Sequence, residues 1–168
     1  MTDTLQVTKS GDLEVVIARA FDAPRALVFD AFTKPELVKR WLLGPSGWSM
    51  PVCEIDLKVG GALRYEWRHD AKGTDMGMSG VFREIVPPDR IVHTELFDED
   101  WTGGETLVTT MFTEEGGKTT ATMTVRYSSS EAREAALGTG MTRGMAESYD
   151  RLAEVLATLA PNDSKSAA

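Results

Sequence analysis

The segment from Arg40 to Gly61, RWLLGPSGWSMPVCEIDLKVGG, constrains the fold more than any other part of the sequence. Its apolar helix end at residues 41–43 stops at Gly44–Pro45, because proline has no N–H to donate and glycine tolerates a turn. We expect a strand from Trp48 to Val59. The strand closes on Gly60–Gly61, a pair that permits backbone angles that other residues resist. The segment therefore predicts a helix, a turn, a strand and a second turn in close succession.

The flanking segments predict a mixture of helices and strands. Leu13 to Phe21 is apolar and rich in β-branched residues, which predicts a first strand. Two short helices follow, one containing residues 26–32 and one from Glu36 to Leu43. Six further strand segments are expected at Trp48–Val59, Ala62–His69, Met76–Val86, Arg90–Phe97, Glu105–Thr113 and Thr119–Tyr127. The turns between them are short, so these strands should be antiparallel neighbours.

The last part of the sequence predicts one long amphipathic helix from Ser130 to Leu159, with a stop signal at Pro161. Its apolar residues recur at three- and four-residue intervals and form one stripe: Leu137, Met141, Met145, Tyr149, Leu152, Leu156 and Leu159. Gly138, Gly140 and Gly144 lie in its first half. Each glycine costs a helix up to about 1 kcal/mol relative to alanine, so the three indicate close backbone packing or deliberate space.

One helix can cover so many strands only if the sheet curls around it. The element order therefore predicts an α+β helix-grip fold: a curved antiparallel sheet of six or seven strands wrapped around a long C-terminal helix, with two short helices after the first strand. We expect a single domain over residues 12–160, a flexible N-terminus at residues 1–11 and a disordered tail at residues 161–168.

Composition narrows the classes of partner and the cellular location. The chain has 168 residues and a formal net charge of −8, and an acidic balance argues against nucleic acid and anionic membrane surfaces as partners. Cys53 is the single cysteine, so an internal disulfide is excluded, and neither a signal peptide nor a membrane-spanning apolar run is visible. These features predict a cytoplasmic protein with no nucleic-acid or membrane partner. The oligomeric state is not predicted.

Several motifs resemble the SRPBCC (START-like, Bet v 1-like) superfamily, and within it the family named for the activator of the heat-shock protein 90 ATPase. They are FTKPE at residues 32–36, Trp41, GPSGW at 44–48, EIDLKVGG at 54–61, EIVPPDRIVHTELF at 84–97, LVTTMF at 107–112 and TGMTRGMAESYDRLAEVL at 139–156. The resemblance covers about residues 12 to 160. It implies the helix-grip fold but no single activity, because the superfamily includes lipid carriers, polyketide cyclases, hydroxylase subunits and co-chaperone domains.

The first candidate site is the space between the sheet and the long helix. Aromatic and methionine side chains could line it as a ligand pocket: Trp41, Trp48, Tyr65, Trp67, Met76, Met78, Met141, Met145 and Tyr149. The alternative is that they simply fill the core, which is the commoner role of an apolar stripe. The glycines of the last helix and the helix-grip resemblance both favour a cavity.

The second candidate is the pair His93 and Glu95. If the strand Arg90–Phe97 buries Ile91 and Phe97, alternation places both residues on the same inner face. The rival register, which buries the residues between them, directs the pair to solvent. An inward pair is either a structural hydrogen bond or an acid/base pair that can orient a ligand.

No cofactor or metal site is predicted, because the few His and Cys residues lack the close spacing of a metal site. The leading hypothesis is a protein that binds a small hydrophobic or aromatic, lipid- or polyketide-like molecule, rather than an enzyme. An enzyme of the cyclase or hydrolase type using His93 and Glu95 is the second hypothesis. A co-chaperone-like module with a chaperone partner, which the family resemblance implies, is the third.

Overall fold

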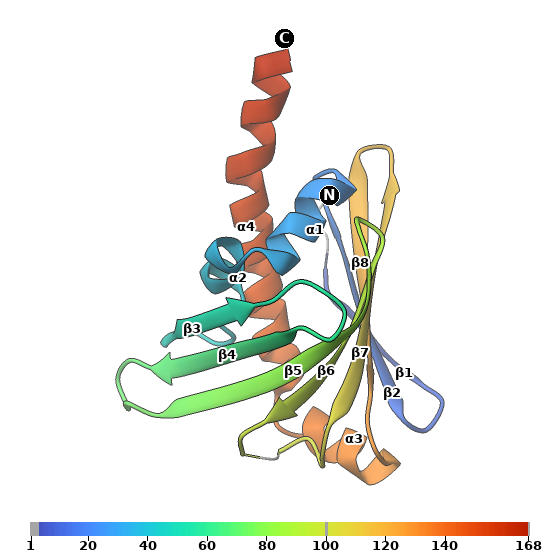
Figure 1. Ribbon diagram of the computed structural model, residues 1–168, viewed down its shortest axis with the longest axis vertical. Helices are drawn as coiled ribbons and strands as arrows, with labels where there is room; N and C mark the ends of the chain where they lie inside the picture. Colours follow the sequence, from blue (N-terminus) through green and yellow to red (C-terminus); the bar gives the residue numbers. More distant parts are fainter. Residues whose placement is uncertain (1–3, 100, 168) are drawn as a thin grey trace.

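The structure, a computed structural model, describes residues 4–99 and 101–167, and for residues 160–167 it describes the backbone alone. Its described part contains eight strands and four helices (Figure 1). In chain order they are β1 (Gln6–Ser10), β2 (Glu14–Phe21), α1 (Arg25–Thr33), α2 (Pro35–Trp41), β3 (Trp48–Ile55), β4 (Ala62–His69), β5 (Asp75–Val86), β6 (Arg90–Phe97), β7 (Thr106–Glu115), β8 (Lys118–Arg126), α3 (Ser130–Leu137) and α4 (Met141–Ala167).

The strands form one open antiparallel sheet in the order β1-β2-β8-β7-β6-β5-β4-β3. The sheet bends strongly, and α4 runs across the face around which it bends (Figure 1). Two register shifts assist the bend, one in β3 between Ser49 and Val52 and one in β5 between Phe82 and Glu84. In β5, Gly80 is required because a Cβ there would collide with the backbone oxygen of Thr94 on β6. The predicted α+β helix-grip fold is confirmed.

The two short helices cover α4 and the adjoining end of the sheet. Pro35 opens α2, where its missing N–H costs nothing, and the Trp41 indole Nε1 at the end of α2 donates to the Ala31 carbonyl of α1 at 2.9 Å. This bond fixes the two helices to each other. Their inward residues, such as Val28 and Val38, are almost fully buried.

A cluster of rings, which we call the aromatic core, fills the space where α1, α2 and α4 meet the sheet. Its ring centroids lie 4.9–6.2 Å apart, mostly edge to face. The members are Phe21, Phe29, Phe32, Trp41, Phe112 and Tyr149. Tyr149 comes from α4 and is 0 % exposed, so the long helix anchors the cluster.

The sheet has one strand more than the highest predicted number. Residues 6–10, expected to belong to a flexible N-terminus, form β1 and pair with β2 from Gln6↔Ala18 to Ser10↔Glu14. All five residues of β1 are exposed, so the strand shows no alternation of apolar and polar residues that sequence reasoning could detect. Its order comes from the backbone ladder with β2 instead.

The predicted single helix over residues 130–159 is also wrong in two respects. It is interrupted after Leu137, because Gly140 takes a φ of +84°, a left-handed conformation that ends a right-handed helix. The second half then continues to Ala167, past the predicted end at Leu159, and residue 168 lies outside the described residues. The helix thus runs through Pro161, although a proline removes one helical hydrogen bond and crowds the preceding turn.

Candidate functional site

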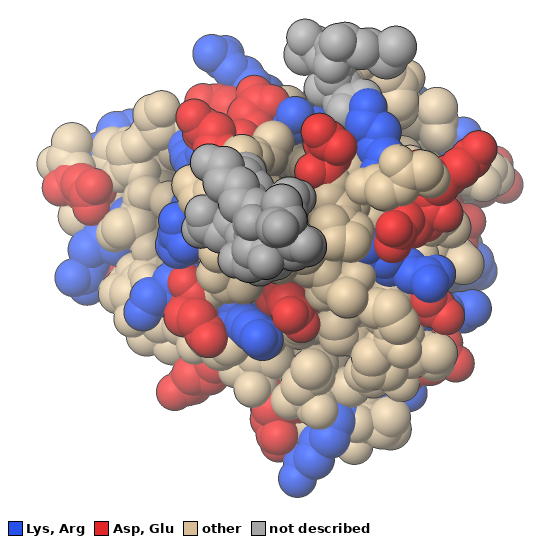
Figure 2. All heavy atoms as spheres, turned by 90° about the horizontal axis from the view of Figure 1, so that it is seen from above, with Lys and Arg blue, Asp and Glu red and all other residues tan. Residues whose placement is uncertain are grey.

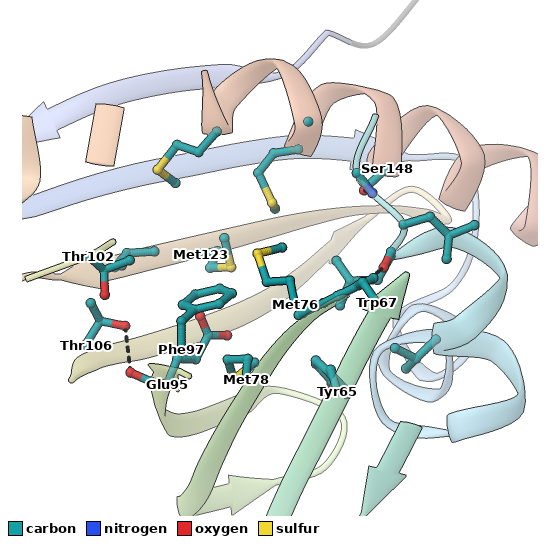
Figure 3. A pocket seen from close by; sticks show the side chains of 18 of the residues that line it. Tyr65, Trp67, Met76, Met78, Glu95, Phe97, Thr102, Thr106, Met123 and Ser148 are labelled. Atoms are coloured by element: carbon teal, nitrogen blue, oxygen red, sulfur yellow. Dashed lines mark hydrogen bonds between the residues drawn. The ribbon is translucent and has the colours of Figure 1, made fainter. Parts of the chain in front are cut away.

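A cavity of about 470 Å³ lies between the sheet and α4. Figure 3 shows its interior, with side chains from the strands reaching toward the helix. Every residue that the sequence analysis placed in a ligand site lies on its wall: Trp41, Trp48, Tyr65, Trp67, Met76, Met78, His93, Glu95, Met141, Met145 and Tyr149. Their position on the wall is a feature of the structure, whereas their contact with a ligand stays a prediction.

One wall of the cavity is a row of aromatic rings. The alternation of β4 directs Tyr65 and Trp67 inward, with centroids 5.7 Å apart, and Phe97 of β6 stacks on Trp67 at 6.2 Å. Trp101, in the β6–β7 loop, extends the row with its centroid 4.7 Å from Phe97. The Trp67 indole Nε1 donates to the Leu42 carbonyl at 2.7 Å, which fixes the ring. A flat apolar surface of this kind suits a flat apolar ligand.

The other walls are rich in methionine. Met76 and Met78 come from β5, Met123 from β8, and Met141 and Met145 from α4. In Figure 3 Met76 and Met123 reach into the space beneath the helix. Methionine is flexible and polarizable and adapts to irregular shapes, so these walls can adjust to different ligands.

The cavity reaches the surface where the α2–β3 turn faces the start of α4. Pro45, Thr139 and Gly140 are exposed members of its lining. The Gly44 N–H donates to the Ser148 hydroxyl at 2.8 Å, and this bond holds the turn against the helix. Trp41, three residues before Gly44 of this turn, also lines the cavity but is only 2 % exposed.

His93 and Glu95 both face the cavity, so the inward register of β6 is the one that forms. Ile91 and Phe97 line the cavity with them, whereas Thr94 lies on the opposite face and accepts a hydrogen bond from the Val81 N–H at 3.0 Å. His93 Nε2 lies 2.9 Å from Glu95 Oε2. Their side chains are 15 % and 24 % exposed. The structure thus brings the predicted pair together inside the cavity.

Glu95 places a negative charge close to three tyrosines of the wall. Burial raises the pKa of the Tyr65, Tyr127 and Tyr149 hydroxyls above the usual range, and the Glu95 charge raises each pKa further. For Tyr127 the pKa rises to about 12. The phenols therefore stay uncharged at neutral pH. Within the described chain the cavity wall contains no Lys or Arg, so nothing on the wall except His93 can offset the carboxylate.

Three buried polar atoms of the wall have no hydrogen-bond partner within the described residues. They are His93 Nδ1, Trp101 Nε1 and the Tyr149 hydroxyl. A buried polar group without a partner costs about 1–3 kcal/mol, so such groups require an explanation. Tyr127 differs, because its hydroxyl donates to the Met141 sulfur at 3.3 Å. The three atoms could each bond to a polar group of a ligand.

The described residues offer neither a metal-binding cluster nor a reactive thiol in the cavity. Among the described residues no three His, Cys, Asp or Glu side chains come together in a group that could hold a metal ion. Cys53 is half-buried and lies outside the cavity wall, and burial raises the pKa of its thiol to about 11. A protonated thiol is a weak nucleophile and a weak metal ligand.

No helix in the described part of the chain is both long and apolar enough to cross a membrane.

Sequence reasoning missed some of the wall. Met123, Val125 and Tyr127 occupy alternate positions on or just after β8. The two-residue alternation that places Tyr65 and Trp67 of β4 on one face would therefore have identified them. Trp101 and Thr102 belong to the β6–β7 loop, and no periodicity in the sequence indicates that this loop folds back over the sheet.

Comparison with known proteins identifies relatives along most of the chain. A family model described as "Activator of Hsp90 ATPase homolog 1-like protein" matches residues 22–157. A protein from Rhodobacter sphaeroides is 35% identical over 94% of this chain and 100% of its own, with a TM-score of 0.88. One from Arthrobacter aurescens is 26% identical over 91% of both chains, with a TM-score of 0.81.

A third solved structure, the AHSA1-like protein from Aeromonas hydrophila, shares the fold at 20% identity and a TM-score of 0.61, over 80% of this chain and 92% of its own. None of the curated proteins matches the sequence.

Proposed function

The chain belongs to the family of Activator of Hsp90 ATPase homolog 1-like proteins, and within this family we propose that it binds a small hydrophobic or aromatic molecule in the cavity between the sheet and α4. The aromatic row of Tyr65, Trp67 and Phe97 would hold one face of the ligand, and methionines of α4 would cover the other.

The observation that carries this proposal is the cavity itself. Protein interiors pack with few voids larger than a water molecule, whereas this one encloses about 470 Å³. That volume lies within the range of about 300–1,000 Å³ typical of small-molecule sites. A site of this kind also combines mostly apolar walls with a few polar groups, and here the polar groups include His93, Glu95 and Tyr149.

The face that Figure 2 shows has no continuous charged patch that would suggest a second binding site outside the cavity. Acidic and basic side chains are interspersed there, without a continuous basic patch of the sort that binds nucleic acid. The formal net charge of −8 points the same way. A small uncharged molecule is therefore a better match to this protein than a polyanion.

Native mass spectrometry of the freshly purified protein tests the proposal first, because a co-purified molecule would add a defined mass. Thermal melting with a panel of lipids and polyketides then tests which class binds, since a ligand that binds only the folded state raises the Tm. No added mass and no shift with any member of the panel would contradict the proposal.

A matched pair of variants separates the cavity from the rest of the surface. Met123→Trp places a large ring in the cavity, and Met111→Trp places the same ring on the neighbouring strand β7, where Met111 is 43% exposed. We expect the first variant to lose the ligand-induced shift in Tm and the second to keep it. Loss in both variants would indicate that binding occurs elsewhere.

An enzymatic role is the second candidate, and the 2.9 Å contact between His93 Nε2 and Glu95 Oε2 inside the cavity favours it. Such a pair can move a proton on a bound substrate. Replacing both residues would then abolish turnover of a bound molecule and leave its binding measurable. A chaperone-linked role, which the family name suggests, would instead give a stoichiometric chaperone partner in a pull-down.

A further inference from the structure

The hydrogen bond between His93 and Glu95 determines what the cavity offers to a ligand. An ionised carboxylate only accepts hydrogen bonds, so the 2.9 Å contact assigns a proton to His93 Nε2. In the neutral ring, Nδ1 then has a free lone pair. Nδ1 is buried and has no partner among the described residues, so the cavity presents an acceptor at this point.

Two other buried atoms need the opposite partner. Trp101 Nε1 can only donate, and the Tyr149 hydroxyl can donate or accept. Both residues belong to the same cavity wall as His93. A ligand that satisfies all three atoms must therefore supply a hydrogen-bond donor together with acceptor oxygens. Hydroxyl groups provide both, whereas an ammonium group only donates and a carboxylate only accepts.

Charge excludes one large class of amphiphile. Glu95 is the one acidic residue of the wall, and the wall has no Lys or Arg within the described chain. A carboxylate or phosphate brought into this apolar space would meet a like charge with no Lys or Arg side chain on the wall to offset it. Like-charge contacts in a desolvated site cost several kcal/mol, so anionic amphiphiles should be rejected.

A cationic ligand would be attracted by Glu95, yet it fits the polar groups of the cavity less well than a hydroxylated one. It would lose its hydration to reach a carboxylate that already accepts a bond from His93. It would also leave the Trp101 N–H without an acceptor. The aromatic row offers it some attraction, but two of the three unpartnered atoms favour an oxygen.

We propose that the ligand is an uncharged, ring-containing molecule with hydroxyl groups, one of which donates to His93 Nδ1, and that Glu95 excludes carboxylate-bearing amphiphiles. This inference rests on the proposed function, and it adds the polar chemistry of the ligand. Lipids with a free carboxylate are then not ligands, although their chains would fit an apolar cavity.

Four matched fluorescent probes test the inference: pyrene, 1-hydroxypyrene, 1-pyrenecarboxylate and 1-pyrenemethylammonium. They share one flat ring system and differ in a single substituent. In fluorescence titrations at neutral pH we expect 1-hydroxypyrene to bind about tenfold or more tightly than the carboxylate and the ammonium probe, and several-fold more tightly than pyrene. The order of the four affinities in the unmodified protein tests the inference without any variant.

Three variants assign the effect to its residues. Glu95→Gln removes the charge and keeps the shape, so it should reduce the discrimination against the carboxylate to a few-fold. His93→Phe keeps a ring without Nδ1 and should remove the advantage of 1-hydroxypyrene over pyrene. Glu54→Gln, at an exposed position outside the cavity wall, is the control and should leave all four affinities unchanged.

The possible failures are distinguishable. If all four probes bind with the same affinity, the cavity binds ligands and the inference about their polar group is wrong. Tight binding of the carboxylate or the ammonium probe by the unmodified protein also overturns it, as does a Glu95→Gln variant with unchanged discrimination. If no probe binds, the proposed function fails together with the inference.

Discussion

The space beneath α4 is filled at one end and hollow at the other. At the filled end the aromatic core brings together rings such as Phe21, Phe32 and Trp41 around Tyr149, with centroids 4.9–6.2 Å apart. At the hollow end the same helix presents Met141 and Met145 to the aromatic row across a cavity of about 470 Å³. Phe32, Trp41 and Tyr149 belong to both regions, so the boundary lies at these three rings.

The difference follows from which side chains α4 and its partners contribute. The filled end receives rings from α1, α2, β2 and β7, which interlock with a ring of α4. At the hollow end α4 contributes methionines and Gly144, whose missing side chain lets Gly44 and Pro45 of the α2–β3 turn lie close to the helix. One amphipathic stripe thus supplies stability at one end and room for a ligand at the other.

The largest effect should come from the filled end. Phe112→Ala removes a ring that is 1 % exposed and that contacts Phe29 and Phe32, so we expect a loss of about 3–5 kcal/mol in the free energy of unfolding. Urea denaturation measures it through the change in midpoint at constant m-value. A loss below about 1 kcal/mol would show that the two ends do not differ in packing.

Two positions on the stripe of α4 compare the ends directly. Leu152 is 0 % exposed, whereas Met145 lies two turns earlier, on the cavity wall. We expect Leu152→Ala to cost about 3 kcal/mol and Met145→Ala about 1 kcal/mol, because the methionine already lacks neighbours on one side. Equal losses in urea denaturation would mean that the cavity wall is packed as tightly as the core.

Substitutions at the break between α3 and α4 should change the stability by smaller amounts and in opposite directions. Gly140 has a φ of +84°, so Gly140→Ala should destabilise the protein by about 1 kcal/mol. Gly138 has a φ of −69°, and Gly138→Ala should stabilise it by about 0.4–1 kcal/mol, because alanine restricts the unfolded chain. Thermal melting of both variants would show opposite shifts. Shifts of the same sign would contradict the assigned backbone conformations.

Sequence patterns predicted many of the residues on the cavity wall but not the contrast between the two ends, and what they missed has physical causes. The period-two alternation in β4 places Tyr65 and Trp67 on the cavity wall, and the stripe of α4 places Met145 and Tyr149 there. The pattern could not identify Trp101, whose position depends on how a loop folds back over the sheet. It also could not show that the cavity stays open, because that depends on volumes contributed by distant segments.

The hydroxyl of Tyr149 tests the boundary between the two ends. It is buried without a partner in the described residues, so Tyr149→Phe should leave stability unchanged or raise it by up to about 1 kcal/mol, while a hydroxylated ligand binds several-fold more weakly. Tyr127→Phe is the comparison, because that hydroxyl has a bond to Met141. A destabilised Tyr149→Phe variant would place the residue wholly in the packed core.

The last effect appears only at alkaline pH and concerns Cys53, which pairs with Tyr65 of the aromatic row on the adjacent strand. Burial raises the pKa of the thiol from 9.0 to about 11, and the Lys39 charge lowers it by less. Between pH 9 and 11 the unfolded chain has therefore lost this proton while the folded protein keeps it. The contribution of the Cys53 thiol to the free energy of unfolding is fully present below pH 9 and is lost as the pH rises through about 11.

Urea denaturation across this pH window should show a decline that is shallower in Cys53→Ala than in the unmodified protein. The rate of alkylation by iodoacetamide in the folded protein should rise mainly between pH 10 and 11, because the thiolate is the reactive form. Rapid alkylation at pH 8 would instead show that water reaches the strand beside the cavity wall. In that case the hollow end would be open on its β3 side as well as at the α2–β3 turn.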